Sequence, residues 1–210
     1  QAFRGQIFLI KMGGSAMENP ELVKKVMRDI VFLEVVGVNP VIVHGGGKAI
    51  SAAMAEAGLK AEFIGGFRVT SPEAISIVEK TLTDTLNPGL VDMLREFGGK
   101  AVGVPGTDVF IGERIKGIND DGERVDIGRV GQVVGSQKEK MQEALNANIV
   151  PVISPLASEL GTGKPLNVNA DLAAAALAKD LRAAKLIYLS DVPGLMQDPS
   201  KPETLIPSIN

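Results

Sequence analysis

The chain has 210 residues, of which 45% are hydrophobic and 22% charged, and its formal net charge is −3. Such a chain is long enough to bury a full core, and its charge gives no electrostatic reason to expect a nucleic acid or an anionic membrane as partner. It has no cysteine, which excludes disulfides, thiol nucleophiles and cysteine–zinc sites, and a single histidine, His44, which excludes a multi-histidine metal site. No apolar run approaches the ~20 residues that span a bilayer, and we expect a cytoplasmic protein.

Strand and helix patterns alternate along the chain. Short apolar runs predict buried strands at 7–10, 41–43, 101–104, 149–153 and 186–189. Helical spacing or helix-start residues predict helices from 20 to about 36, from 48 to about 58, from 72, from 88, at 138–146 and at 170–181. Asn87-Pro88 is interpreted as the start of a separate helix, because proline suits the first helical turn. We expect a loop at 63–70 and, around Asn119–Gly122, a hairpin on an edge of the sheet.

This alternation predicts an α/β protein with a mainly parallel sheet covered by helices on both faces. Ligands of such sheets bind beyond the carboxyl ends of the strands. Two glycine turns fall at that position: Lys11-Met12-Gly13-Gly14-Ser15 follows the first strand and Gly45-Gly46-Gly47 follows the second. Backbone N–H groups exposed beside a helix N-terminus suit an anion, so the pair of turns favours a phosphate-handling site.

Neither turn fits the commonest phosphate motifs. Lys48 is followed by Ala49 where a P-loop needs Ser or Thr, and the spacing G-x-G-x-x-G is absent. His44-Gly45-Gly46-Gly47 could belong to a lipase oxyanion hole, but the chain lacks G-x-S-x-G and a second histidine. Lys11 could be a solvated lysine at a strand end. Alternatively, it could bring a positive charge to a phosphate, as phosphoryl transfer requires.

Asn167, Asn169 and Asp171 lie close together before an alanine-rich helix. Any one of them could be explained as a helix cap. Three are more than a cap needs, and we expect Asp171 to bridge phosphate-binding lysines and Asn167 to hydrogen-bond an acidic substrate.

Five motifs, in order along nearly the whole chain, resemble the amino acid kinase family, and within it the members that phosphorylate N-acetyl-L-glutamate. They are Lys11-Met12-Gly13-Gly14, His44-Gly45-Gly46-Gly47, Gly66-Phe67-Arg68-Val69-Thr70, Asn167-Val168-Asn169-Ala170-Asp171 and Leu189-Ser190-Asp191-Val192-Pro193-Gly194. The resemblance implies a three-layer αβα sandwich and the ATP-dependent phosphorylation of the acid's side-chain carboxylate, to N-acetylglutamyl 5-phosphate, in arginine biosynthesis.

The resemblance also assigns roles to individual positions. Lys11 would stabilise the transferring phosphoryl group and Asp171 would orient the cationic groups, while the N–H groups of Gly14 and Gly46 would donate to phosphoryl oxygens. The acid would be bound by Gly46, Gly47, Arg68 and Asn167. ATP would be bound by Gly13, Gly14, Ser190, Asp191, Val192, Pro193, Gly194, Leu195 and Met196, with Mg²⁺ held mainly by phosphates and waters and no dedicated metal site.

The resemblance further implies two lobes. Residues 1–165 would bind the acid and carry a dimer interface, and 166–210 would begin an ATP-binding lobe. Family members carry a second phosphate-binding lysine beyond the position that matches Asn210, so we expect residues 1–210 alone to be nearly inactive. Phe3-Arg4-Gly5 is similar to the sequence of arginine-inhibited members whose homodimers interlace into a hexamer.

Two other functions stay open. A related kinase could act on carrier-bound aminoadipate, aspartate or uridylate, although Arg68 in its motif together with Asn167–Asp171 favours acetylglutamate. A non-catalytic nucleotide or amino-acid sensor could have kept the pockets. Nothing in the sequence indicates whether a PII-type signalling protein binds.

Overall fold

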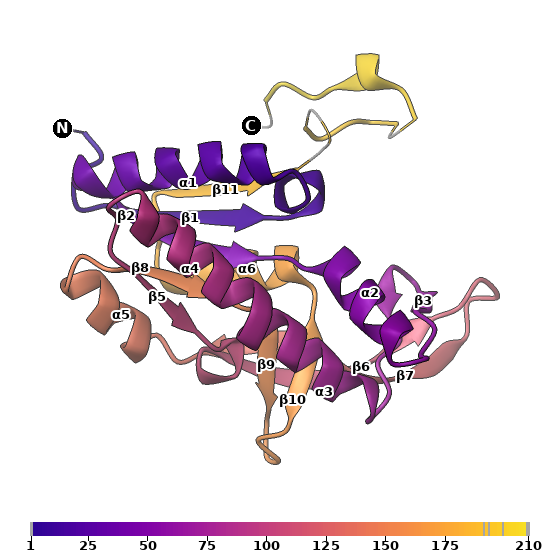
Figure 1. Ribbon diagram of the computed structural model, residues 1–210. Helices are drawn as coiled ribbons and strands as arrows, with labels where there is room; N and C mark the ends of the chain where they lie inside the picture. Colours follow the sequence, from indigo (N-terminus) through magenta and orange to yellow (C-terminus); the bar gives the residue numbers. More distant parts are fainter. Residues whose placement is uncertain (1, 191, 193, 199, 209–210) are drawn as a thin grey trace.

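Five parallel strands form the central sheet (Figure 1), in the order β11 (Lys185–Leu189), β1 (Ile7–Met12), β2 (Asn39–His44), β8 (Val150–Ile153) and β5 (Ala101–Val104). Each neighbouring pair is parallel, so all carboxyl ends lie at one edge. The computed structural model describes residues 2–190, 192, 194–198 and 200–208. The five expected strands are confirmed. β1 runs to Met12, so Lys11 belongs to the strand and the first turn begins at Gly13.

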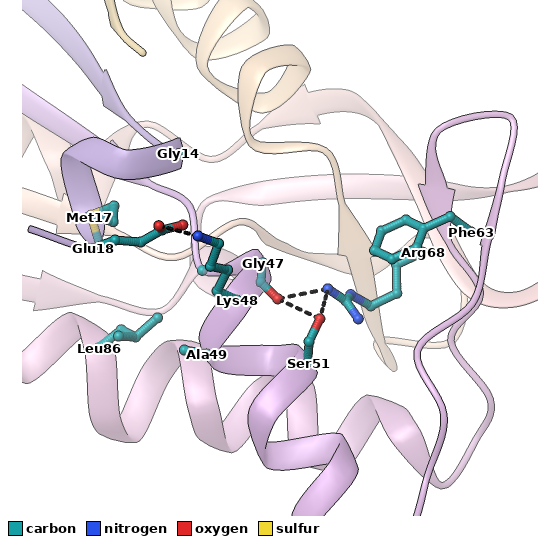
Figure 2. A pocket seen from close by; sticks show the side chains of 11 residues that line it. Gly14, Met17, Glu18, Gly47, Lys48, Ala49, Ser51, Phe63, Arg68 and Leu86 are labelled. Atoms are coloured by element: carbon teal, nitrogen blue, oxygen red, sulfur yellow. Dashed lines mark hydrogen bonds and ion pairs between the residues drawn. The ribbon is translucent and has the colours of Figure 1, made fainter. Parts of the chain in front are cut away.

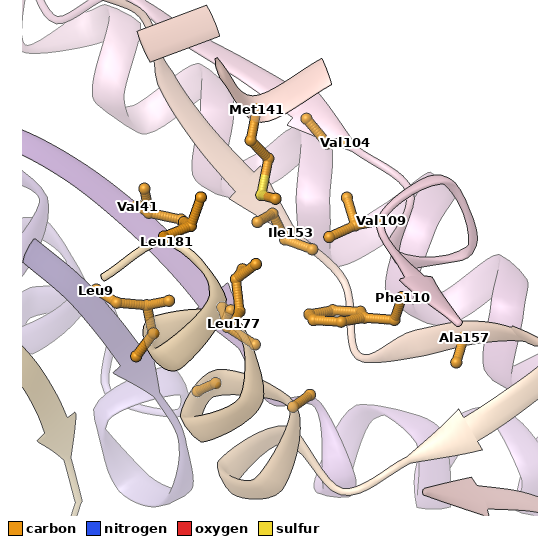
Figure 3. Packing of buried hydrophobic residues seen from close by; sticks show 14 of the residues in the cluster. Leu9, Val41, Val104, Val109, Phe110, Met141, Ile153, Ala157, Leu177 and Leu181 are labelled. Atoms are coloured by element: carbon orange, nitrogen blue, oxygen red, sulfur yellow. The ribbon is translucent and has the colours of Figure 1, made fainter. Parts of the chain in front are cut away.

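Alternating side chains of the strands build two hydrophobic layers. Leu9, Val41 and Val43 face α5 (Glu139–Asn146) and α6 (Ala170–Asp180), and Figure 3 shows Leu9 beside Leu177 and Val41 beside Leu181. Ile10 and Ile42, one residue along, face α1 (Pro20–Val35) and α4 (Asn87–Glu96). This period of two produces helices on both faces, and the expected three-layer αβα sandwich is confirmed.

The helices expected from 20 and from 170 are also present, and each begins after a capping asparagine, Asn19 or Asn169. The Asn19 side chain accepts hydrogen bonds from the N–H groups of Glu21 and Leu22, and Pro20 is the first residue of α1. Such caps satisfy N–H groups that have no partner within the helix. None of the helices in the described part of the chain is long and apolar enough to cross a membrane.

The helix expected from Asn87-Pro88 is present as α4, but it is not separate from the helix before it. Helix α3 (Ala74–Glu79) continues through a π-helical segment, η2 (Lys80–Leu86), directly into α4. The Asn87 N–H donates to the Leu82 carbonyl, five residues back. A proline inside a helix can be accommodated by such a π turn instead of breaking the helix, and sequence alone does not distinguish the two outcomes.

The expected hairpin around Asn119 is present, but its placement on an edge of the main sheet is wrong. Strands β6 (Phe110–Ile118) and β7 (Arg124–Ser136) close a small barrel with β9 (Leu156–Glu159) and β10 (Pro165–Val168). Two register shifts interrupt the β6–β7 pairing. Because bulges increase local twist, the hairpin can curl away from the sheet and close on these short strands.

The expected loop at 63–70 contains a minimal hairpin, β3 (Phe63–Ile64) and β4 (Phe67–Arg68), beyond helix α2 (Gly47–Glu56). Short 3-10 helices lie at η1 (Gly14–Met17), η3 (Gly106–Asp108) and η4 (Pro202–Thr204). Helices α2 and α3 share a third hydrophobic cluster with Leu156 of the barrel. The barrel and α2 are thereby held together beyond the carboxyl edge of the sheet.

Candidate active site

Three adjoining cavities lie along the carboxyl ends of β1, β2 and β11. The central cavity, about 280 Å³, is lined by both glycine turns, Lys11, Arg68, Asn167 and Asp171. The side cavity, about 360 Å³, shares Gly14, Gly46 and Arg68 with it and extends to Glu18 and Lys48 (Figure 2). The edge cavity, about 650 Å³, lies beside β11 and shares Asp171 with the central one. The residues expected to bind phosphate and acid are therefore brought together, although they come from distant parts of the chain.

Lys11 and Asp171 form an ion pair in the central cavity, with Lys11 Nζ 2.8 Å from Asp171 Oδ1. The Lys11 side chain is 12% exposed, whereas that of Asp171, in the first turn of α6, is 53% exposed. Lys11 bends back over the first turn, and a Cβ at Gly13 would overlap its ammonium group. Glycine at this position leaves room for a cation directly above the backbone of the turn.

The two turns divide their N–H groups between the sheet and the cavity. The N–H of Gly13 donates to Leu189 O at 3.3 Å, and that of Gly45 donates to Met12 O at 2.6 Å. Within the described part of the chain, the N–H groups of Gly14 and Gly46 donate to no protein acceptor. Gly46 also caps the N-terminus of α2. Unpaired N–H groups at a helix N-terminus favour an anion.

Gly46 is packed from behind by the π-helical segment. A Cβ there would lie 2.6 Å from Leu82 Cδ2 and 2.7 Å from Leu86 Cδ1. Real Cβ atoms do not approach other atoms so closely, so a larger residue would displace either the turn or the leucines. The second turn is therefore sterically fixed against the helix behind it.

Arg68 is held by helix α2 before any ligand arrives. Its Nη2 donates to Gly47 O at 2.8 Å and to Ser51 Oγ at 2.9 Å, and its guanidinium lies 4.7 Å from the centre of the Phe63 ring (Figure 2). The residue is 7% exposed, and burial lowers the pKa of the guanidinium, which still stays charged at neutral pH. Because both hydrogens of Nη2 are used, a carboxylate would be met by Nε or Nη1.

The three polar residues before and within the start of α6 have separate tasks. Asn169 is the cap, and its Oδ1 accepts from the N–H groups of Asp171 and Leu172. Asp171 pairs with Lys11, and Asn167 Nδ2 donates to Thr70 Oγ1 at 3.1 Å. The capping interpretation is therefore correct for Asn169 alone, and the other two side chains are directed to the central cavity.

The residues expected to bind ATP are divided between two cavities. Gly13 and Gly14 line the central cavity, whereas Ser190, Val192, Gly194 and Leu195 line the edge cavity. Met196 forms an isolated bridge with Leu205 and does not line either cavity. Asp191 and Pro193 lie outside the described residues.

Sequence reasoning missed several residues of the site. Tyr188, the only tyrosine, lines the edge cavity and donates from its hydroxyl to Asp171 O at 3.2 Å. Burial, and then the charge of Asp171, raise the pKa of this phenol. An ion pair between Lys48 and Glu18 joins α2 to the segment after η1 across the side cavity (Figure 2). A single tyrosine at the end of a predicted strand is a pattern that could have pointed to Tyr188. No local sequence pattern indicates the ion pair between Lys48 and Glu18.

The sequence assigns no separate role to the side chain of His44. It is fully buried, and burial lowers its pKa to about 4, only partly opposed by a hydrogen bond to the Gly45 carbonyl. Its ring is therefore neutral at neutral pH and lies directly beneath the second turn.

A model of the amino acid kinase family matches residues 6–210. Acetylglutamate kinase of Akkermansia muciniphila is 66% identical over 209 residues, covering 100% of this chain and 70% of that protein. Acetylglutamate kinase of Methanocaldococcus jannaschii is 42% identical over 211 residues, covering 98% and 70%. A crystal structure from Streptococcus mutans UA159 has a TM-score of 0.79 at 31% identity, covering 92% of this chain and 76% of that one. The chain belongs to the amino acid kinase family.

Proposed function

We propose that this protein transfers the γ-phosphoryl group of ATP to the side-chain carboxylate of N-acetyl-L-glutamate, giving N-acetylglutamyl 5-phosphate and ADP for arginine biosynthesis. The observation that carries the proposal is the Lys11–Asp171 ion pair within one cavity that also contains both glycine turns, Arg68 and Asn167. The relatives that are 66% and 42% identical are both acetylglutamate kinases, which supports this substrate over other acids.

The chemistry requires stabilised charge more than proton transfer. The acceptor carboxylate, with an ordinary pKa of about 4.3, is already ionised at neutral pH and needs no general base. One of its oxygens bonds to the γ-phosphorus while the bond from that phosphorus to ADP breaks, and ADP leaves with the electron pair. Lys11 draws off the growing charge, and the N–H groups of Gly14 and Gly46 donate to the phosphoryl oxygens. Asp171 acts by orienting the Lys11 ammonium, which is why it is paired instead of free.

The acid occupies the part of the central cavity near the barrel. Arg68, already oriented by Gly47 O and Ser51 Oγ, binds the α-carboxylate through its remaining N–H groups. Asn167, oriented by Thr70, binds the other end of the acid, and the backbone of Gly46 and Gly47 forms the wall between them.

ATP binds with its phosphates at Gly13 and Gly14 and its base and sugar along the edge cavity, beside Ser190, Val192, Gly194 and Leu195. Asp171 lines both cavities, so a nucleotide there would point its phosphates at Lys11. The described residues include no group of three or more His, Asp or Glu that could hold a metal. Mg²⁺ would be held mainly by phosphates and waters and would neutralise charge on the phosphates.

We further propose a homodimer, assembled into a hexamer if Phe3-Arg4-Gly5 is part of an interlacing N-terminal region, with arginine as inhibitor. Residues 1–165 would form the acid-binding and dimerising lobe, and 166–210 the start of the ATP lobe. Light scattering of the full-length protein with and without arginine tests this assembly, and a monomer unaffected by arginine would contradict it.

A substrate panel tests the function. Full-length protein is assayed for ADP release with N-acetyl-L-glutamate, aspartate, uridylate and carrier-bound aminoadipate, and the acyl phosphate is trapped with hydroxylamine. We expect release and trapping with N-acetyl-L-glutamate alone. A preference for another acceptor would assign a different substrate, and nucleotide binding without turnover would indicate a sensor.

A further inference from the structure

We propose that His44 is a positioning residue that turns the Gly46 N–H toward the central cavity by holding the Gly45 carbonyl on the opposite side. The inference rests on the proposed function, in which that N–H donates to the transferring phosphoryl group. It adds a role for a buried side chain that touches no substrate.

The hydrogen bonds of His44 define which ring nitrogen carries the proton. Nε2 lies 3.2 Å from Asn87 Nδ2, and Nδ1 lies 2.8 Å from Gly45 O. An amide nitrogen can only donate, so Nε2 is the acceptor and the ring proton lies on Nδ1. Nδ1–H therefore donates to the Gly45 carbonyl, which is the next residue along the chain.

Asn87 is itself fixed in one orientation. Its Nδ2 also donates to Val152 O of β8 at 2.8 Å, and the residue is 4% exposed. Both amide hydrogens are thereby used. Its Oδ1 fills the space that a Cβ at Gly103 would need. The π-helical segment that delivers Asn87 also packs Leu82 and Leu86 against Gly46, so one element supports both sides of the turn.

Peptide geometry transmits this restraint to Gly46. The Gly45 carbonyl and the Gly46 N–H belong to one planar trans peptide, in which the two groups point in opposite directions. The carbonyl is held toward the buried ring of His44, so the N–H points away from the core. Gly46 lines both the central and the side cavity, and its N–H donates to no acceptor among the described residues.

The surroundings of the ring preserve the required tautomer. His44 is fully buried, and its lowered pKa keeps it neutral at neutral pH. A neutral ring is needed, because a doubly protonated one would direct Nε2–H at the hydrogens of Asn87. If His44 and Asn87 served only to stabilise the sheet, catalysis would not depend on a hydrogen-bond donor at the Nδ1 position of His44.

That difference defines the experiment, which uses full-length protein and steady-state kinetics. His44→Asn places an amide donor near the Nδ1 position, whereas His44→Phe keeps a ring of similar size without a donor. We expect His44→Phe to lower kcat on the order of 10²-fold, with both KM values changed less than about threefold. His44→Asn should stay within about tenfold of wild type.

Melting temperatures separate this effect from loss of folding. If His44→Phe does not fold because Asn87 loses its acceptor, the double variant His44→Phe/Asn87→Leu removes that unpaired donor and is measured instead. Equal kcat in the donor-free and donor-retaining variants, whether both high or both low, would overturn the proposal.

An NMR measurement makes the positioning claim separable from the proposed function. In ¹⁵N-glycine-labelled wild type without ligands, the Gly46 N–H should exchange with solvent much faster than the Gly45 N–H, which is bonded to Met12 O. Slow exchange at Gly46 would overturn the positioning claim even in an active kinase. An inactive wild type with fast exchange at Gly46 would overturn the proposed function alone.

Discussion

The two glycine turns follow neighbouring strands of the same sheet, yet they differ in what supports them. The first turn lies under a charged side chain, because Lys11 bends back over Gly13 to reach Asp171. The second is supported by neutral groups, with His44 beneath it and Leu82 and Leu86 behind it. One turn thus brings a cation to the cavity, and the other brings a rigid backbone N–H.

This difference explains why similar glycine motifs need not be equally sensitive to the same substitution. Charge at the first turn can be removed with little loss of packing, because Lys11 contributes through its ammonium. The second turn packs against Leu82, a member of a hydrophobic cluster, so changes there affect stability and geometry together.

Lys11→Ala should lower kcat by about 10²–10³, because one preorganised charge at a transition state is worth ~3–4 kcal/mol. Its melting temperature should change little, since the ion pair with Asp171 is partly solvated on the carboxylate side. Steady-state kinetics and calorimetry measure both. Lys24→Ala, which removes a surface ion pair of α1, is the matched control and should change neither. A large stability loss in Lys11→Ala with normal kcat would reverse the proposed roles of the turns.

Acid should destabilise the fold through His44. Its pKa is about 4 when folded and 6.5 when unfolded, so between these values the unfolded chain binds a proton that the native state does not. The stabilisation is complete above pH 6.5 and is lost as pH falls toward 4, by about 3 kcal/mol in total. Urea unfolding from pH 7.5 to 4 measures it. His44→Asn should lose this part of the pH dependence, and an unchanged slope would place the titration elsewhere.

Gly46→Ala should destabilise by ~1–3 kcal/mol through overpacking against Leu82 and Leu86, and should lower kcat as the turn moves. Leu82→Ala should lower the free energy of unfolding less in the Gly46→Ala variant than in wild type, because it makes room for the new methyl group. Gly89→Ala is the control, since a Cβ there meets open space in α4, and it should be neutral or stabilising by up to ~1 kcal/mol. Strict additivity of Gly46→Ala and Leu82→Ala would argue against the packed turn.

Arg68→Lys should raise KM for the acid by roughly tenfold while changing kcat less, because lysine cannot reproduce the fork or the contact with the Phe63 ring. Arg95→Lys removes a similar arginine-to-carbonyl hydrogen bond, at Ala101 O, and should leave KM unchanged. An Arg68→Lys variant with wild-type KM would exclude Arg68 from acid binding.

Local patterns in the sequence were sufficient for the sheet, most of the helices and the first turn. Buried strands, caps such as Asn19 and Asn169, and glycine turns are short-range signals, and they predict the strand ends at which Lys11 and the glycines lie. The Lys11–Asp171 contact also follows from the resemblance, since its motifs assign both residues to one site. The strands, helix caps and glycine turns are all determined by residues that are close together in the sequence.

The remaining features depend on contacts between distant residues. The barrel forms because β6–β7 curls onto β9 and β10, and the continuous helix through Pro88 depends on a π turn. Gly46 is supported by His44, Asn87 and Val152, which lie far apart in the sequence. No local sequence pattern indicates that these three residues are in contact. Sequence reasoning therefore found the groups that line the cavities better than the groups that hold them in place.

The most direct test of the central claim is a crystal structure of full-length protein with N-acetyl-L-glutamate, Mg²⁺, ADP and aluminium fluoride, which mimics the transferring phosphoryl group. The proposed account predicts the planar fluoride group between the two turns, within hydrogen-bond distance of Lys11 Nζ and the N–H groups of Gly14 and Gly46. A fluoride group bound elsewhere, with Lys11 still paired only to Asp171, would contradict it.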